Sequence, residues 1–259
     1  MRIEDLTLEI TRRCNMKCDH CMRGPAQRLD MSKETISKIF SQIDEIGTIT
    51  FTGGEPSLKP ELIYQVFQEL HYRNIPLRSF YVATNAHSTY RRMEFLEALE
   101  RLYWLSEEQD MCALEVSQDN YHMYLHQPSF KYYNEGWVGE YDEWIEPYDF
   151  IHLEARKYAL DELINDGRAR NISGAKREKK HVKPWVVTKE EDGDLSVSSE
   201  RYTYISANGN VSTAANISFE RADKHCLGNV HQRPLRDIIE SNSISEEQYW
   251  NAINYKEAA

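Results

Sequence analysis

The sequence has 259 residues, of which 41% are hydrophobic and 28% are charged, and its formal net charge is −11. The acidic balance argues against a protein that wraps a nucleic-acid backbone, which requires a basic surface. No apolar run approaches the ~20 residues needed to cross a bilayer, and the start, MRIEDLTLEITRRC, lacks the apolar stretch of a secretory signal, so we expect a cytoplasmic protein without a membrane partner.

The first part of the chain alternates short strands with amphipathic helices. Strands are expected at residues 6–11, 48–52, 79–84, 112–117, 150–153 and 169–172. Helices are expected at 35–43 behind a Ser32 N-cap, at 60–73 with Pro60 in first position, at 93–105 and at 155–164. This alternation is typical of parallel β/α units. The sequence therefore predicts an α/β fold, a partial and open barrel of six β/α units over residues 1–175.

Residues 176–259 follow a different pattern and are expected to form a small hairpin-plus-helix extension. The basic run at 176–183 and the polar stretch at 189–199 are interpreted as surface loops. Residues 202–212 alternate on both sides of Asn208-Gly209, a dipeptide that favours a type I′ hairpin turn. Two helices, at 235–241 and 245–255, are expected to close the chain.

Three of the five cysteines lie close together in CNMKCDHC, residues 14–21, directly after the first expected strand. Tetrahedral zinc and cubane iron–sulfur clusters both normally take four protein ligands. The loop fits a zinc site completed by a histidine, or an iron–sulfur cluster whose fourth iron meets a small molecule. Cys112 is interpreted as a small buried hydrophobe, and the odd number of thiols does not suggest a disulfide framework.

A second motif, FTGGEP at residues 51–56, lies at the end of the next expected strand. Glycines there would let a ligand approach the backbone closely. Glu55 would offer a carboxylate that holds an ammonium group through charge-assisted hydrogen bonds. Both motifs fall at the carboxyl ends of strands, where the loops of a β/α barrel converge on one mouth.

CNMKCDHC and FTGGEP together resemble the two signature motifs of the radical S-adenosylmethionine (radical SAM) superfamily, and the resemblance covers the predicted barrel. It implies a TIM-barrel-like fold and a 4Fe–4S cluster ligated by Cys14, Cys18 and Cys21. The amino and carboxylate groups of SAM would chelate the fourth iron. Reductive cleavage of SAM would then give a 5′-deoxyadenosyl radical that abstracts hydrogen from a substrate.

The resemblance also implies residues near SAM. His20 takes a position usually held by an aromatic ring, and Arg168, in the sequence Gly-Arg-Ala, would pair with the SAM carboxylate. The implied SAM-binding set is His20, Gly53, Gly54, Glu55, Asn85, Ser117, Asp119 and Arg168. The alternatives are a packed loop residue for His20, turn formers for Asn85 and Asp119, and a helix-end charge for Arg168. No residue is identified as catalytic.

Residues 204–239 resemble the SPASM or twitch extension of radical SAM enzymes that modify peptides. The hairpin is followed by Ser-Thr-Ala-Ala at 212–215, without a thiol, and Cys226 alone cannot hold an auxiliary cluster. We therefore expect the extension at 176–259 to lack one. The aromatic-rich segment 121–148 is interpreted as an excursion packed on the barrel or as a substrate lid.

The resemblance favours a peptide substrate, as in the tailoring of ribosomal peptides, with a nucleoside or other small metabolite as the alternative. It also implies a flavodoxin or ferredoxin-type electron donor. A non-catalytic iron–sulfur or zinc-binding module is the further alternative.

Overall fold

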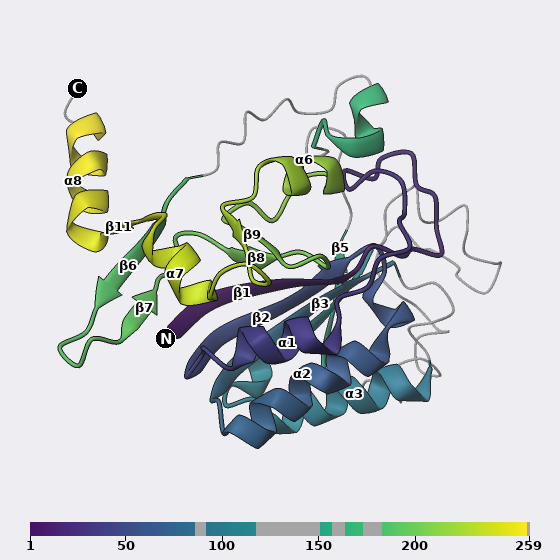
Figure 1. Cartoon of the computed structure of the whole chain (residues 1–259). Coiled ribbons are helices and arrows are strands. Elements are labelled where there is room, and N and C mark those ends of the chain that lie inside the picture. Colours follow the sequence, from purple (N-terminus) through teal and green to yellow (C-terminus); the bar gives the residue numbers. More distant parts are fainter. Residues whose placement is uncertain (86–91, 118–150, 157–163, 173–182, 258–259) are drawn as a thin grey trace.

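The computed structural model describes residues 1–85, 92–117, 151–156, 164–172 and 183–257 (Figure 1). Asp119, the aromatic-rich segment 121–148, the basic run up to residue 182 and most of the helix expected at 155–164 lie outside these residues. Within the described ranges, the helices are all too short or too polar to cross a bilayer.

A parallel sheet forms the frame of the molecule. Its first five strands stand side by side in chain order, each parallel to the next: β1 (Arg2–Thr11), β2 (Glu45–Gly53), β3 (Leu77–Thr84), β4 (Ala113–Ser117) and β5 (His152–Arg156). Parallel neighbours require crossover connections, and helices supply the described ones. The alternating pattern of the sequence is therefore confirmed as an α/β fold with a parallel sheet.

Three helices lie on one side of this sheet: α1 (Lys33–Phe40), α2 (Pro60–Arg73) and α3 (Met93–Leu105) (Figure 1). Each turns its apolar stripe toward the strands, as the 3.6-residue period requires. Fully buried members of these stripes are Ile36, Ile39, Ile63, Val66, Leu70, Phe95 and Leu99. They pack on the outer face of β1–β3, so the core lies between helices and sheet and leaves the strand ends free for a site.

The sixth strand expected at 169–172 is wrong. Residues Gly167–Asn171 form a 3-10 helix, which starts from Gly167 at φ +54° with the Asp166 carboxylate capping its first amide. The backbone amide of Arg168 donates to Cys21 O at 2.9 Å. This segment therefore bonds to the cysteine loop instead of extending the sheet beyond β5.

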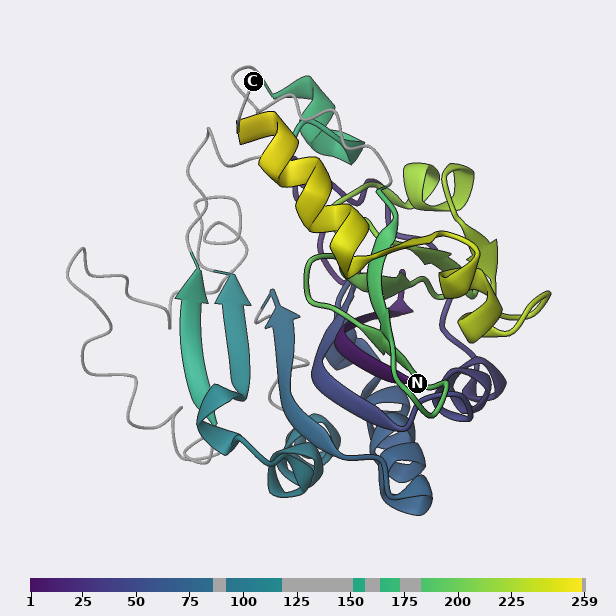
Figure 2. The same cartoon turned by 90° about the vertical axis from the view of Figure 1, so that its left-hand side faces the viewer.

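The C-terminal extension continues the sheet on the other side of β1, away from β3–β5 (Figure 2). Its strands are β6 (Trp185–Lys189), β7 (Leu195–Val197), β8 (Thr203–Ile205), β9 (Asn210–Ser212), β10 (Gly228–Asn229) and β11 (Ser243–Ser245). Its helices are α6 (Phe219–Lys224), α7 (Leu235–Glu240) and α8 (Glu246–Glu257), the last packing on β6 and β11. Both β7 and β8 pair with β1 in parallel.

Two expectations for the extension need correction. The polar stretch 189–199 is not a loop throughout: it contains β7, antiparallel to β6, with Leu195 and Val197 buried. The hairpin of β8 and β9 is confirmed, but its turn is not type I′, because Asn74 is the one non-glycine residue with positive φ in the described ranges. Gly209 alone takes φ +82° there, and its amide donates to Ser206 O at 2.8 Å, a turn followed by a left-handed glycine.

Candidate functional site

The three clustered cysteines lie on a loop, residues 12–30, whose two ends are fixed at the carboxyl end of β1. The Arg12 amide donates to Leu29 O at 2.8 Å and the Gln27 amide to Arg12 O at 2.9 Å. The Thr11 hydroxyl and the Arg13 guanidinium both donate to Asp30. These bonds close the neck of the loop, so the thiols are presented by an anchored segment.

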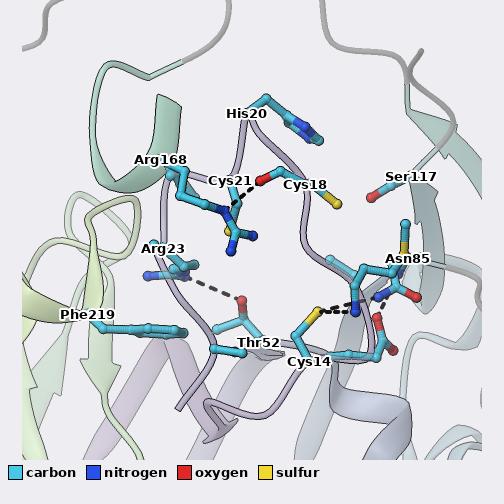
Figure 3. A pocket seen from close by; sticks show the side chains of 18 of the residues that line it. Cys14, Cys18, His20, Cys21, Arg23, Thr52, Asn85, Ser117, Arg168 and Phe219 are labelled. Atoms are coloured by element: carbon cyan, nitrogen blue, oxygen red, sulfur yellow. Dashed lines mark hydrogen bonds between the residues drawn. The ribbon is translucent and has the colours of Figure 1, made fainter. Parts of the chain in front are cut away.

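One cavity of about 340 Å³ lies beneath this loop, and Cys14, Cys18 and Cys21 surround it (Figure 3). The ends of β2, β3 and β4 form part of its wall. Of the residues implied to bind SAM, seven line this cavity: His20, Gly53, Gly54, Glu55, Asn85, Ser117 and Arg168. The eighth, Asp119, lies outside the described residues. The two sequence motifs and the three strand ends thus meet at a single place.

The two glycines of the second motif allow close contact between backbones. A Cβ atom added to Gly53, whose φ is +144°, would lie 2.0 Å from Thr11 O, and one added to Gly54 would lie 2.2 Å from Arg13 O. The amides of Gly54 and Glu55 donate to those same two carbonyl oxygens at 2.8 Å. These contacts join β2 to the start of the cysteine loop; since both glycines also line the cavity, close approach of a ligand to them stays a prediction.

Glu55 joins the ends of β2 and β3. Its side chain is 1% exposed, and the carboxylate accepts from the Ser57 amide and hydroxyl, the Thr84 hydroxyl and the Asn85 amide. Burial raises the pKa of Glu55, and these hydrogen bonds oppose the rise. A carboxylate has about four acceptor positions, so these four donors fill them. Glu55 therefore has a structural task at the strand ends, and because it also lines the cavity, its contact with an ammonium group stays a prediction.

Cys14 lies at the junction of the cysteine loop and β3. Its sulfur accepts hydrogen bonds from the Met16 amide at 3.4 Å and from Asn85 Nδ2 at 3.7 Å, and that same amide group donates to Asn15 Oδ1 at 2.9 Å. Burial raises the pKa of the Cys14 thiol, and the Met16 hydrogen bond opposes the rise. Asn85 thus orients the first cysteine and its neighbour.

Arg168 holds the outer part of the cysteine loop. Its Nε donates to Cys18 O at 2.7 Å, and its amide donates to Cys21 O (Figure 3). The preceding Gly167 is required for this approach, because a Cβ there would lie 2.3 Å from Met22 O. The Gly-Arg-Ala sequence therefore binds the cysteine loop, while the Arg168 side chain also lines the cavity.

Sequence reasoning missed further residues of the cavity wall: Arg23, Thr52, Glu115, Asn216 and Phe219. Glu115 had a local signal, since it is two residues before Ser117 and strand residues two apart share a face. Arg23 donates to Thr52 Oγ1 at 3.4 Å and to Ile217 O at 3.0 Å, so it links the cysteine loop to β2 and to the extension. Asn216 and Phe219 come from the distant extension and carry no local signal.

The donor set fits an iron–sulfur cluster. Three thiols from one anchored loop face one cavity, and hydrogen bonds reach the Cys14 sulfur, as at cluster thiolates. In the described part of the chain, no three side chains of His, Cys, Asp or Glu converge on one metal ion. In a cubane cluster each cysteine ligates a different iron. Three thiols spaced around one cavity are therefore compatible with such a cluster.

Comparisons with known proteins agree with this arrangement. A family model described as "Radical SAM superfamily" matches residues 8–134. An 81-residue segment is 36% identical to GTP 3',8-cyclase of Staphylococcus epidermidis and covers 27% of this chain, but only 23% of that relative. The chain therefore spans less than a quarter of the curated relative that it matches.

The fold is similar to that of two solved structures, "Native anSMEcpe with bound AdoMet and Cp18Cys peptide" and its counterpart with Kp18Cys peptide. Their TM-scores are 0.52 and 0.53 at 14% sequence identity, and each match covers 93% of this chain and 81% of the other. At this identity the likeness concerns the fold. The family model covers both the cysteine and the glycine motif, and on this match residues 8–134 belong to the radical SAM superfamily.

Proposed function

We propose that this chain is a radical SAM enzyme whose 4Fe–4S cluster is ligated by Cys14, Cys18 and Cys21. The observation that carries the proposal is the meeting of these three thiols with the ends of β2, β3 and β4 around one cavity. The fourth iron would be left for SAM. When bound, the cluster and SAM would together supply a 5′-deoxyadenosyl radical for hydrogen abstraction from a substrate.

The protein's own residues would hold and orient these groups. His20, Asn85, Ser117 and Arg168 offer an imidazole, an amide, a hydroxyl and a guanidinium to the cavity, and the amide and guanidinium also fix the cysteine loop. Gly53, Gly54 and Glu55 seat that loop on β2 and β3, and because they also line the cavity they remain proposed contacts of SAM. Asp119 remains a proposed contact of SAM, two residues beyond Ser117.

A peptide is the substrate that we favour, and a nucleoside or other small metabolite is the second candidate. The peptide is supported by the fold shared with a radical SAM protein that binds a peptide, and by the hairpin extension that continues the sheet. The metabolite is supported by the local similarity to GTP 3',8-cyclase. Reduction would come from a flavodoxin or ferredoxin-type donor.

The test of the proposed function is anaerobic reconstitution with iron and sulfide, followed by dithionite and SAM. We expect a brown protein with about four irons per chain that forms 5′-deoxyadenosine. Cys14→Ser, Cys18→Ser and Cys21→Ser should each abolish 5′-deoxyadenosine formation. Cys112→Ser is the matched control, because Cys112 is buried beside Glu108 and does not line the cavity, and it should keep wild-type activity.

Two outcomes would reject the proposal. A colourless protein with about one zinc per chain would favour the zinc-binding module. A full cluster without SAM cleavage would favour the non-catalytic iron–sulfur module. Deuterium transfer into 5′-deoxyadenosine from labelled candidate peptides, compared with labelled nucleotides, would then separate the two substrate classes.

A further inference from the structure

The entrance of the cysteine loop is joined to the C-terminal extension by an ion pair between the buried Arg12 and the half-exposed Asp223. Arg12, two residues before Cys14, is 1% exposed. Its Nη1 lies 2.7 Å from Asp223 Oδ2 and its Nη2 lies 2.8 Å from Asp223 Oδ1, a bidentate geometry, while its Nε donates to Glu9 Oε1 at 2.6 Å. Helix α6 therefore contacts the first residue of the loop that carries the thiols.

The same guanidinium supports a wall of the cavity. Its carbon lies 4.9 Å from the centre of the Phe219 ring, and Phe219 lines the cavity (Figure 3). Burial disfavours the charge on Arg12, but the hydrogen bonds and charges of Asp223 and Glu9 outweigh it and raise the pKa of Arg12. Hydrogen bonds hold two edges of the Arg12 guanidinium, and the Phe219 ring lies against one of its faces. The orientation of this group is therefore fixed.

The far end of the cysteine loop is tied to the same part of the extension. Arg23 O accepts from the Phe219 amide at 3.1 Å, and Arg23 Nη1 donates to Ile217 O. Asp166, beside the Gly-Arg-Ala sequence, accepts from the Ser218 amide at 2.8 Å. The segment 217–223 thus contacts the cysteine loop before its first thiol and after its last one.

Asp223 is the one charge of the extension that faces Arg12 within the described contacts, and it also orders the hairpin turn. Its Oδ1 accepts from Asn208 Nδ2 at 2.9 Å and from Asn210 Nδ2 at 3.2 Å. The Asp223 side chain is 39% exposed. An asparagine therefore fits at this position, but it removes the charge that pairs with Arg12 and replaces one acceptor by a donor.

We propose that Asp223 is a positioning residue for the cluster site: through Arg12 it fixes the backbone before Cys14 and the Phe219 wall of the cavity. The C-terminal extension is then part of the iron–sulfur site although it supplies no ligand. The consequence for the cluster rests on the proposed function, whereas the effect on the loop is a property of the chain alone.

The first arm of the test is amide hydrogen exchange in the cluster-free protein, comparing wild type, Asp223→Asn and the control Asp237→Asn, an exposed site on α7. The amides of Arg12 and Gln27, which close the neck of the loop, are the reporters. We expect about tenfold faster exchange at both in Asp223→Asn, because a charge-assisted contact is lost. Amides in the middle of α2 should be unchanged. Unaltered exchange at the neck would overturn the proposal.

The second arm uses the reconstituted protein and the electron paramagnetic resonance (EPR) spectrum of the reduced cluster, with and without SAM. Asp223→Asn should show a broadened spectrum and a several-fold weaker response to SAM. Asp223→Glu should restore part of that response, and Asp237→Asn should match wild type. A wild-type spectrum in Asp223→Asn would contradict the proposal. Failure of the wild type to build a cluster would instead reject the proposed function.

Should Asp223→Asn fail to fold, Arg12→Lys keeps the charge while removing the bidentate geometry. It should show the same faster exchange at the Arg12 and Gln27 amides, while amides in the middle of α2 stay as in wild type, and its melting temperature should fall because the buried guanidinium loses its contacts with Glu9 and Asp223. Wild-type exchange in this variant would equally overturn the proposal.

Discussion

Single backbone atoms decide how the cysteine loop sits on the sheet. Gly53 and Gly54 bring the end of β2 against Thr11 O and Arg13 O, and Gly167 brings the Gly-Arg-Ala segment against Met22 O. None of these positions has room for a Cβ atom. The cavity is therefore built by backbone contact first, and its polar side chains are added to that frame.

Gly53→Ala tests this contact. We expect a loss of at least about 3 kcal/mol in the free energy of unfolding, the upper range for overpacking, because the new methyl group meets a backbone oxygen that cannot rotate away. Gly193→Ala is the control, since Gly193 also has positive φ, +85°, but has open space around it. Urea denaturation of both variants gives the comparison. Equal losses of stability in the two variants would mean that backbone strain at positive φ, and not the contact with Thr11 O, causes the effect.

At this scale the sequence identified the cavity through its motifs but not the tasks of its residues. Cys14, Gly53 and Arg168 were found because their motifs are local. The saturation of Glu55 by four donors depends on where β3 ends beside β2, and the contribution of Phe219 depends on a contact across most of the chain. Neither is encoded in a local pattern.

The regular elements follow their sequence signals closely. Helix α2 begins at Pro60 and α3 spans Met93–Leu105, as predicted, because caps and apolar periodicity act locally. The prediction failed at Gly167–Asn171, where the tertiary bond to the cysteine loop overrides an apparent strand pattern, and at β7, whose three residues are too short to show an alternation.

Helix α1 offers a test of a single cap. The Ser32 hydroxyl accepts from the Thr35 amide at 3.0 Å. Ser32→Ala should lower the free energy of unfolding by about 1 kcal/mol, because that amide loses its partner. Lys33→Ala, at the exposed first position of the same helix, should stay close to wild type in the same denaturation experiment. A loss in Lys33→Ala as large as that in Ser32→Ala would contradict this reading of the cap.

Across the whole molecule, acidic side chains tie the extension to the barrel. Burial alone would raise the pKa of Asp166, but hydrogen bonds from Ser218, Arg170 and Gly167 outweigh it, and the pKa lies below the usual 3.8. The pKa of Asp223 is also lowered, since the hydrogen bonds from Arg12, Asn208 and Asn210 and the charge of Arg12 together outweigh its burial. Both carboxylates are thus more acidic in the folded chain than in the unfolded one.

This difference predicts acid sensitivity. The stability contributed by Asp166 is fully present above pH 3.8 and is lost as the pH falls through its folded pKa, because the unfolded chain then binds the proton more readily. Asp166→Asn should be less stable than wild type at pH 7, and the difference should shrink as the pH falls below 3.8. Urea denaturation across this range measures it, and a constant difference would contradict the assignment.

We propose that three cysteines of one anchored loop hold a cluster with an iron left for SAM. The most direct test of this proposal is the EPR spectrum of the reduced, anaerobically reconstituted protein, recorded before and after SAM is added. We expect a shifted spectrum on addition of SAM, and no such shift in Cys18→Ser. A reduced cluster whose spectrum stays the same in the presence of saturating SAM would contradict it.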